Sequence, residues 1–370
     1  MTPQETREAV VLEAVRERRE RVNEAIPDEL PIDRPERLYE ASRYLLDAGG
    51  KRLRPTVLLV AAEALADVEP LSEPYRTFPT CSAALPGEKA GDADGEVTGD
   101  GQNVDTVDVM AAAVSVEVIQ SFTLIHDDIM DDDELRRGVP AVHEEYDLET
   151  AILAGDTLYS KAFEIMLGTG ATTDRTVHAL DVLAKTCTKI CEGQSLDVSF
   201  ESRSAVTTDE YLEMIEQKTA VLYAASASLP AILMGADQET VDALYGYGLD
   251  VGRGFQIHDD VLDLTVPSEK LGKQRGSDLV ENKQTLITVH AREHGVEVGD
   301  LVDTTDVSNV TEAEIDDALN VLEDAGSIDY ARETAHELVE QGKERLDVLA
   351  DNEARKLLTD IADYLVERGY

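Results

Sequence analysis

Two short runs of aspartate, each at the end of a long apolar stretch, constrain the fold of this 370-residue chain most strongly. Each run carries three aspartates at positions i, i+1 and i+4. These are Asp127, Asp128 and Asp131 in the first run and Asp259, Asp260 and Asp263 in the second. On a helix this spacing stacks the first and third carboxylates one turn apart, with the second beside them. We therefore expect two core helices, each ending in three carboxylates, which face each other across the cavity of a helical bundle.

Three carboxylates in one patch repel one another unless a cation lies among them. A few carboxylates that leave other positions to water and phosphate oxygens suit Mg²⁺ better than a fully protein-ligated Ca²⁺. We therefore interpret all six aspartates as ligands of several Mg²⁺ ions. The alternative is a solvated acidic face, which is the commoner origin of such clusters. The apolar run at 114–125 argues against it, because carboxylates at the end of a core helix are costly without a partner.

The chain has 77 acidic and 33 basic side chains and a formal net charge of −44. This charge excludes binding of nucleic acid or of an anionic membrane through a general basic surface. It is typical of halophilic proteins, in which concentrated salt screens the repulsion among carboxylates. A contact with a charged partner is the alternative, which is weaker because the acidic residues are spread along the chain.

Three cysteines, Cys81, Cys187 and Cys191, form no disulfide framework, and the N-terminal residues lack the apolar core of a signal peptide. No uncharged run of about 18 apolar residues is present, so no membrane-spanning helix is expected. These features predict a cytoplasmic protein. Cys187 and Cys191 have the spacing of half a zinc site, but no second ligand pair follows, and small buried apolar side chains are the preferred interpretation.

The hydrophobic pattern is helical along most of the chain. Apolar positions recur at helical spacing, and no alternating strand series with hairpin turns is present. The expected helices cover residues 2–25, 35–48, 107–131, 150–168, 174–200 and 208–235, with three more after residue 311. Thr207–Glu210 and Thr311–Glu314 have the residue types of capping boxes. The chain is therefore predicted to be all-α, a single bundle domain over residues 1–370 around a deep central cavity.

One segment, residues 67–104, departs from this pattern and is rich in Gly, Asp, Pro and Glu. A polar, turn-rich segment of this length predicts a surface loop. Its part at 92–101 superficially resembles a calcium-binding loop but lacks the terminal Glu at the required spacing. We assign the loop to solubility or to a contact specific to this protein.

Basic residues are scarce in this chain, so clusters of them are informative. Lys51, Arg52 and Arg54 lie at the expected start of a helix, where anions are favoured, and predict a diphosphate site. An exposed basic turn is the alternative. Arg136 and Arg137 directly follow the first aspartate run and suggest a ligand held by a metal on one side and by guanidinium groups on the other.

The segments GGKRLRP, HDDIMD with LRRG, and FQIHDDVLD resemble the signature motifs of the trans-isoprenyl diphosphate synthases. Five motifs occur in the family's order between about residues 40 and 290, and the resemblance is strongest to the archaeal geranylgeranyl diphosphate synthases. It implies a homodimeric, Mg²⁺-dependent prenyltransferase. Such an enzyme ionises an allylic diphosphate (dimethylallyl, geranyl or farnesyl), condenses it with isopentenyl diphosphate and releases a proton.

The resemblance also implies a role for each matching residue. Isopentenyl diphosphate would bind to Lys51, Arg54, Gln120 and Arg137. Other substrate contacts would come from Arg136, Lys218 and Thr219 at the allylic site, from Gln256, and from Lys273 and Lys283 of a loop that closes over diphosphates. Catalysis would depend on Lys218 and on the aspartates Asp127, Asp128, Asp131, Asp259 and Asp260.

Phe122 is interpreted as the residue that sets product length. It lies five residues before Asp127, about 7.5 Å deeper along the helix, so its ring could form the floor of a pocket for the growing tail. A core phenylalanine without this role is the alternative. Position 123 is Thr and no insertion interrupts the first motif, a pattern that resembles the twenty-carbon synthases. We therefore expect geranylgeranyl diphosphate, with a fifteen-carbon, mixed or twenty-five-carbon product as alternatives.

Two other protein classes fit less well. A class I terpene cyclase also combines an aspartate-rich motif with Mg²⁺, but its second metal motif is typically of an Asn/Ser/Glu type and it lacks the basic GGKRLRP segment. A non-catalytic subunit would be expected to lack some of the family's catalytic motif residues. In this chain, none of the motif residues compared with the family is missing.

Overall fold

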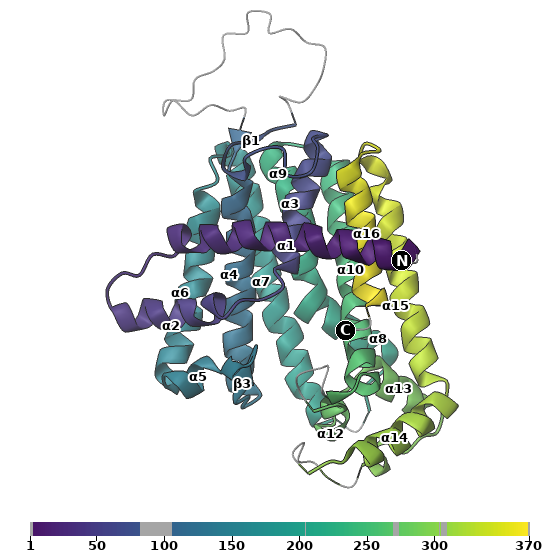
Figure 1. Ribbon diagram of the computed structural model, residues 1–370. Helices are drawn as coiled ribbons and strands as arrows, with labels where there is room; N and C mark the ends of the chain where they lie inside the picture. Colours follow the sequence, from purple (N-terminus) through teal and green to yellow (C-terminus); the bar gives the residue numbers. More distant parts are fainter. Residues whose placement is uncertain are drawn as a thin grey trace, which may run out of the picture. The chain divides into compact units, whose positions relative to one another are not determined.

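The computed structural model describes residues 3–81, 106–203, 205–268, 274–302, 304 and 309–368. Within these residues the chain is almost entirely helical, and its strands are only two residues long each (Figure 1). The prediction of an all-α protein is therefore confirmed.

The elements group into two compact units. Unit 1 consists of Met1–Lys185, Ala225–Tyr245 and Leu346–Asp360, and unit 2 of Thr186–Ala224, Gly246–Arg345 and Ile361–Tyr370. Some elements contribute residues to both units, namely α7 (Thr173–Glu201), α9 (Val221–Met234), α10 (Gln238–Thr265), η4 (Arg345–Val348) and α16 (Glu353–Glu367). The single domain over residues 1–370 stays a prediction.

Unit 1 is built around α4 (Val109–Met130), which carries the first aspartate run at its C-terminal end. Its side chains are buried on nearly all sides, as expected for a helix without a polar face. Its most extensive helix contacts are with α1 (Pro3–Glu29), α3 (Leu53–Ala66) and α6 (Leu148–Leu167), and α1 crosses it at a steep angle (Figure 1). The other elements are α2 (Glu36–Asp47), η1 (Tyr75–Thr77), β1 (Phe78–Pro79), β2 (Thr106–Val107), β3 (Leu135–Arg136), β4 (Val139–Pro140) and α5 (Val142–Glu145).

Of the helices in the described part of the chain, α4 alone is long and apolar enough to span a membrane by length and composition. Because 78% of its apolar window is buried inside the protein, it is a core helix.

Short polar side chains fix where several helices begin. Asp108 accepts a hydrogen bond from the backbone N–H of Ala111 at the start of α4, and Asp147 accepts one from Thr150 at the start of α6. The predicted capping boxes at Thr207–Glu210 and Thr311–Glu314 are both present. These helix starts depend on local sequence, and the prediction of the boxes is confirmed.

The beginning of segment 67–104 differs from the predicted surface loop. Tyr75 and Phe78 are buried, and their rings stack with centroids 5.8 Å apart. β1 pairs with β2 in antiparallel register, which places Phe78 opposite Val107. Residues 82–105, including the calcium-loop resemblance at 92–101, lie outside the described residues.

A buried ion pair explains this packing. Arg18 of α1 and Glu63 of α3 form the pair at 2.5 Å, with 0% and 1% of their side chains exposed. The same carboxylate accepts hydrogen bonds from the hydroxyl of Tyr75 and the N–H of Leu71. Segment 67–81 is therefore fixed to α1 and α3 by one carboxylate, a contact that the turn-rich composition of the segment does not reveal.

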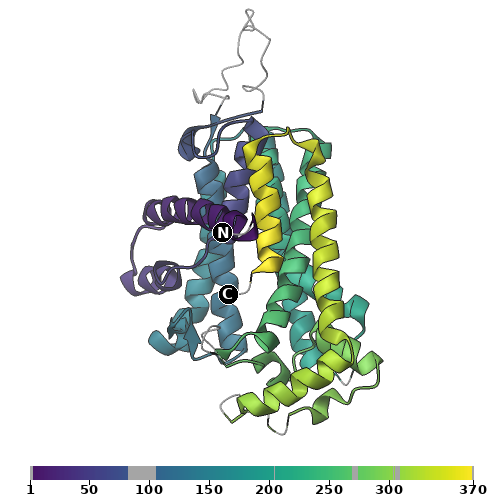
Figure 2. The same ribbon diagram turned by 45° about the vertical axis from the view of Figure 1, so that its right-hand side comes forward.

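Unit 2 contains most of α10, which ends in the second aspartate run. Its other elements are α8 (Thr208–Ile215), η2 (Glu216–Ala220), α12 (Ser277–Val280), α13 (Leu286–Glu293), η3 (Val298–Asp300), α14 (Glu312–Asp324) and α15 (Ser327–Glu344). α13 packs against α15, and α14 turns into α15 through a sharp corner (Figures 1 and 2). Gly326 forms this corner with a φ of 70°.

The helix expected over 208–235 is interrupted. α8 and α9 are joined by a turn of π-helix, η2, which contains Lys218 and Thr219. A π turn shifts the faces of the helix that follows it, and such turns occur frequently at functional sites. Hydrophobic periodicity does not predict this interruption, because the apolar residues continue on both sides of it.

Candidate active site

The first aspartate run contains carboxylates in two different environments. Asp128 is fully buried, whereas Asp127 and Asp131 are half-buried. Nε of Arg136 donates to Oδ1 of Asp128 at 2.6 Å, and Nη2 of Arg136 donates to Asp133 at 2.7 Å. Asp128 therefore positions Arg136, and its role as a direct metal ligand stays a prediction.

Burial raises the pKa of Asp128 to about 6, because removal of the carboxyl from water outweighs the attraction of Arg136. Its Oδ2 is buried and makes no hydrogen bond within the described residues. A buried carboxylate oxygen without a donor is costly. A cation near this oxygen would reduce the cost.

A tight hairpin turn separates the two arginines that follow this run. β3 pairs with β4, so Arg137 and Gly138 form the two-residue connection, and both have positive φ, 56° and 79°. These values correspond to a type I′ turn. Arg136 contacts the aspartates, whereas Nη1 of Arg137 donates to the carbonyl of Leu45 at 3.1 Å and to that of Gly49. The two guanidinium groups thus lie at different places.

The loop before α3 is shaped to receive Arg137. Gly50 has a φ of +150°, and a Cβ at this position would lie 2.8 Å from Cζ of Arg137. A side chain at position 50 would therefore displace the guanidinium group. Lys51 is exposed and Arg54 half-buried at the start of α3. The structure thus brings Arg137 together with the GGKRLRP segment.

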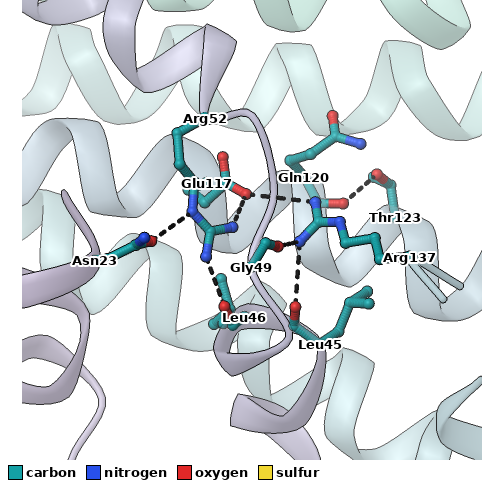
Figure 3. A network of polar contacts seen from close by, with 9 residues as sticks. All are labelled: Asn23, Leu45, Leu46, Gly49, Arg52, Glu117, Gln120, Thr123 and Arg137. Carbon is teal, nitrogen blue, oxygen red and sulfur yellow. Dashed lines mark hydrogen bonds and ion pairs between the residues drawn. The ribbon is translucent and has the colours of Figure 1, made fainter. Parts of the chain in front are cut away.

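Arg52 differs from its neighbours in this basic segment. Its side chain is 0% exposed and donates to Asn23, Glu117 and the carbonyl of Leu46 (Figure 3). It does not extend toward solvent as a diphosphate donor would. Gln120, also predicted for this subsite, lies on α4 one turn after Glu117 and is half-buried.

Phe122 lies within an aromatic cluster between α4 and α6. Its ring is edge-on to the rings of His126 and Tyr159, with centroids 5.1 and 5.3 Å apart. Tyr159 in turn contacts Phe163 at 5.2 Å. The residue proposed to limit product length therefore contacts one aromatic side chain of its own helix, His126, and one of α6, Tyr159.

In the second aspartate run, Asp260 is held by protein groups. It accepts hydrogen bonds from the hydroxyl of Tyr211 at 2.7 Å and from Nε2 of Gln256 at 2.9 Å. Oε1 of Gln256 accepts from the hydroxyl of Thr219 at 2.9 Å, so the contacts join Thr219 of η2 to the aspartate run. Burial raises the pKa of Asp260 well above its ordinary value.

The two other aspartates of this run also have protein partners. Asp263 is buried and accepts hydrogen bonds from the hydroxyl of Ser277 at 3.0 Å and the N–H of Asp278 at 3.2 Å. It thereby anchors the start of α12. Asp259 is half-buried and pairs with Arg368, whose guanidinium group lies over the ring of Phe255.

Lys218 is placed by η2 and by a glycine on α7. Its Nζ donates to Asp197 at 2.5 Å. A Cβ on Gly193 would lie 2.2 Å from the backbone nitrogen of Lys218, so only glycine allows α7 to approach this turn. Of the two remaining predicted residues, Lys283 pairs with Glu281 at 3.0 Å, and Lys273 lies outside the described residues.

Sequence reasoning missed three residues that these contacts reveal. Glu117 is the lone acid of an apolar run, a signal that could have identified it as a buried partner of a cation. Tyr159 and Tyr211 are far in sequence from Phe122 and Asp260, the residues they contact. No pattern in the sequence indicates these two pairs.

The donor set fits a hard divalent cation. The aspartate runs offer carboxylate oxygens, one of them the buried Oδ2 of Asp128 that makes no hydrogen bond within the described residues. Within the same residues, no group of three His, Cys, Asp or Glu side chains is arranged to hold a metal ion alone. Oxygens from a bound ligand would have to complete the coordination.

Comparison with known proteins decides the family. The sequence profile described as polyprenyl synthetase matches residues 35–322. The chain belongs to this family. It is therefore a short-chain trans-prenyl diphosphate synthase, as the resemblance of its motifs predicted.

Relatives of this prenyl synthase match over nearly their full length. It is 69% identical to a geranylfarnesyl diphosphate synthase of Natronomonas pharaonis, covering 96% of this chain and 97% of the relative. It is 48% identical to a geranylgeranyl diphosphate synthase of Methanosarcina mazei, covering 97% of this chain and 98% of the relative.

Solved structures give the same fold. A geranylgeranyl pyrophosphate synthetase from the archaeon Geoglobus acetivorans superposes with a TM-score of 0.79 at 41% identity, covering 96% of this chain and 99% of the other. The enzyme of the same name from Pyrococcus horikoshii gives a TM-score of 0.81 at 35% identity, covering 97% and 99%. The predicted fold class is confirmed.

Proposed function

We propose that this synthase condenses isopentenyl diphosphate with allylic diphosphates and releases geranylfarnesyl diphosphate, the twenty-five-carbon product. The observation that carries the product length is the 69% identity to a geranylfarnesyl diphosphate synthase. The expected twenty-carbon product is the second candidate, because relatives at 48% and 42% identity are geranylgeranyl synthases. In either case, Phe122 is the residue proposed to set the product length, because its ring would limit the depth of the tail pocket.

The allylic diphosphate is assigned to two cations, Arg136 after the first aspartate run and Lys218 on η2. Arg136 is held by Asp128, and Lys218 by Asp197, so both cations have fixed positions before a substrate arrives. Preorganised cations stabilise the charge of a departing diphosphate without first having to be oriented. Within unit 2, Gln256 accepts a hydrogen bond from Thr219, the neighbour of Lys218, and donates one to Asp260.

Magnesium is assigned to each aspartate run by itself: to Asp127, Asp131 and Oδ2 of Asp128 in the first run, and to Asp259 in the second, with oxygens of a bound diphosphate as further ligands. When bound, Mg²⁺ would neutralise the leaving diphosphate and so assist ionisation of the allylic carbon. Asp128 and Asp260 contribute by holding Arg136 and Gln256, and Asp263 by anchoring α12.

Isopentenyl diphosphate is assigned to Lys51, Arg54, Gln120 and Arg137. Lys51 lies on the loop before α3, Arg54 in the first turn of α3, Gln120 on α4 and Arg137 on the hairpin turn. Arg137 is already docked on the loop. Arg136 and Arg137 would thus serve different substrates, which the tight turn between them makes possible. No side-chain nucleophile is needed, because the double bond of isopentenyl diphosphate attacks and the released diphosphate takes the proton.

A second copy of the chain is the proposed partner of α6. Five large apolar side chains on this helix are 38 to 58% exposed, although the protein as a whole is strongly acidic. They are Leu148, Ile152, Leu153, Tyr159 and Leu167. Exposed apolar stripes of this kind mark protein contacts. Light scattering after size exclusion tests the dimer, and Leu153→Lys should yield a monomer.

The cytoplasmic location stays a prediction.

Product analysis tests the proposed function. The protein is incubated in concentrated KCl with Mg²⁺, isopentenyl diphosphate and each allylic starter in turn. A twenty-five-carbon diphosphate supports the proposal, and a twenty-carbon diphosphate keeps the reaction but supports the second candidate. A cyclic hydrocarbon, or no product with any starter, contradicts the reaction itself.

A further inference from the structure

A buried carboxylate on α4, Glu117, connects the two segments assigned to isopentenyl diphosphate. It is 4% exposed and lies 2.5 Å from Nη1 of Arg52 and 3.7 Å from Nη2 of Arg137. Arg52 belongs to the loop before α3, and Arg137 to the hairpin turn after α4. One carboxylate thus pairs with a cation from each segment (Figure 3).

Arg52 uses every nitrogen of its guanidinium group in this contact. Nε donates to Asn23 of α1 at 3.0 Å, Nη1 to Glu117, and Nη2 to the carbonyl of Leu46 at 2.6 Å. A fork of this kind fixes orientation as well as position. The backbone of Arg52 has a φ of 52°, a conformation that costs energy for a non-glycine residue and persists only where surrounding contacts enforce it.

Arg137 is held on the opposite side of the same loop. Its Nη1 donates to the carbonyl of Leu45, one of the last carbonyls of α2, which lack intrahelical donors, and to the carbonyl of Gly49 in the loop that follows. Nη1 makes these two contacts, and Nη2 faces Glu117 at 3.7 Å. Nε and the remaining Nη2 hydrogens are therefore the part of the guanidinium group suited to an anion.

We propose that Glu117 is a positioning residue for isopentenyl diphosphate: by pairing with Arg52 and Arg137 it fixes the loop before α3 and the hairpin turn in one geometry. The inference rests on the proposed function, which assigns Arg137, Lys51 and Arg54 to that substrate. It adds a residue that contacts no substrate and acts through two arginines.

The direction in which Glu117→Gln changes the affinity for isopentenyl diphosphate distinguishes a positioning role from a purely electrostatic one. Glu117→Gln removes one negative charge near a diphosphate site, and charge alone would then make the substrate bind more tightly. A positioning role predicts the opposite. Without the carboxylate, Arg52 is a buried cation that lacks its counter-ion, and the loop and turn lose their common anchor.

The chain offers a matched control, Glu63. The pairs Arg18–Glu63 and Arg52–Glu117 have the same 2.5 Å separation and similar burial, but Glu63 holds segment 67–81 instead of the loop before α3. Glu63→Gln should therefore lower the thermal midpoint by a similar amount without affecting the substrate site. A purely structural role of Glu117 would make the two variants alike.

The experiment compares steady-state kinetics of wild type, Glu117→Gln and Glu63→Gln, with each substrate varied at saturation of the other. We expect KM for isopentenyl diphosphate to rise about tenfold or more in Glu117→Gln, with kcat and KM for the allylic substrate within about threefold of wild type. The proposal is overturned if KM for isopentenyl diphosphate falls or stays unchanged in Glu117→Gln. It is also overturned if kcat/KM falls equally for both substrates, or if Glu63→Gln raises the same KM by an equal factor. Glu117→Asp replaces Glu117→Gln if the latter does not fold, and the same rise is expected from its shorter reach.

Calorimetric titration with isopentenyl diphosphate alone separates this proposal from the proposed function. Weaker binding by Glu117→Gln than by wild type supports the positioning role even if the wild type forms no product, a result that would contradict the function only. A wild type that does not bind isopentenyl diphosphate overturns both.

Discussion

The ring of Tyr159 on α6 lies edge-on to the ring of Phe122 on α4, with centroids 5.3 Å apart. Aromatic pairs in this arrangement contribute about 0.5–1.5 kcal/mol beyond the area they bury. Phe122 is only 9% exposed, so its position depends on this neighbour. If Phe122 limits the tail pocket, Tyr159 contributes to the limit by holding it.

Phe122→Ala is expected to lengthen the main product by at least one five-carbon unit, because the shorter side chain opens the proposed floor. Tyr159→Ala should give a partial shift in the same direction. Chromatography of the dephosphorylated products measures both. Phe78→Leu is the control, since Phe78 is a buried aromatic of the same unit that packs on Tyr75. An unchanged product length in Phe122→Ala would reject its role.

Asp127→Ala is expected to lower kcat about a thousandfold, because a metal ligand contributes several kcal/mol to charge stabilisation. The increase in thermal midpoint that Mg²⁺ and diphosphate together produce in the wild type should shrink in the same variant. Glu134→Gln, an exposed acid close in sequence, should behave like wild type. Near-normal turnover of a folded Asp127→Ala protein would exclude Asp127 as a ligand.

Gly193→Ala is expected to lower activity strongly and to destabilise the fold by about 1–3 kcal/mol. The added methyl group would lie 2.2 Å from the backbone nitrogen of Lys218 and would displace η2. Gly299→Ala is the matched control, because a Cβ there meets no atom within 4 Å. Thermal unfolding and turnover are measured for both, and equal effects would refute the importance of the contact at Gly193.

Removal of salt is expected to weaken folding. The chain carries a net charge of −44, and the screening length grows from about 3 Å in 1 M salt to about 30 Å in 0.01 M salt. The thermal midpoint should fall by roughly 10 °C between concentrated and dilute KCl, a loss of a few kcal/mol for a protein of this size. Circular dichroism measures the midpoint, and a value independent of KCl would contradict halophilic adaptation.

The cysteines should differ in reactivity. Cys187 is buried and burial raises its pKa to about 12, whereas Cys191 is exposed. The shared prediction of small buried side chains is thus confirmed for Cys187 and wrong for Cys191. Because the thiolate is the reactive form, a chromogenic disulfide reagent at pH 8 should modify Cys191 at least a hundredfold faster than Cys187. Variants that lack one of the two cysteines show which cysteine gives the fast phase and which the slow phase of the reaction with the reagent. Equal rates, or protection of both by Zn²⁺, would contradict this and favour half a zinc site.

The sequence by itself determined the features that depend on neighbouring residues. The aspartate runs at the ends of α4 and α10, the capping boxes at Thr207 and Thr311 and the all-α fold follow from helical spacing and local hydrogen bonds. The family followed as well, because its motifs are short and contiguous.

Tertiary structure decided which of these residues act together. Arg136 and Arg137 are adjacent in the sequence, but the type I′ turn directs their side chains to different partners. Arg52 is buried and donates to Glu117, which is 65 positions away in the sequence. Asp128 differs from Asp127 and Asp131 in being fully buried and in its contact with Arg136. These contacts depend on packing between segments that are distant in the chain. The pattern of residue types within one segment therefore does not predict them.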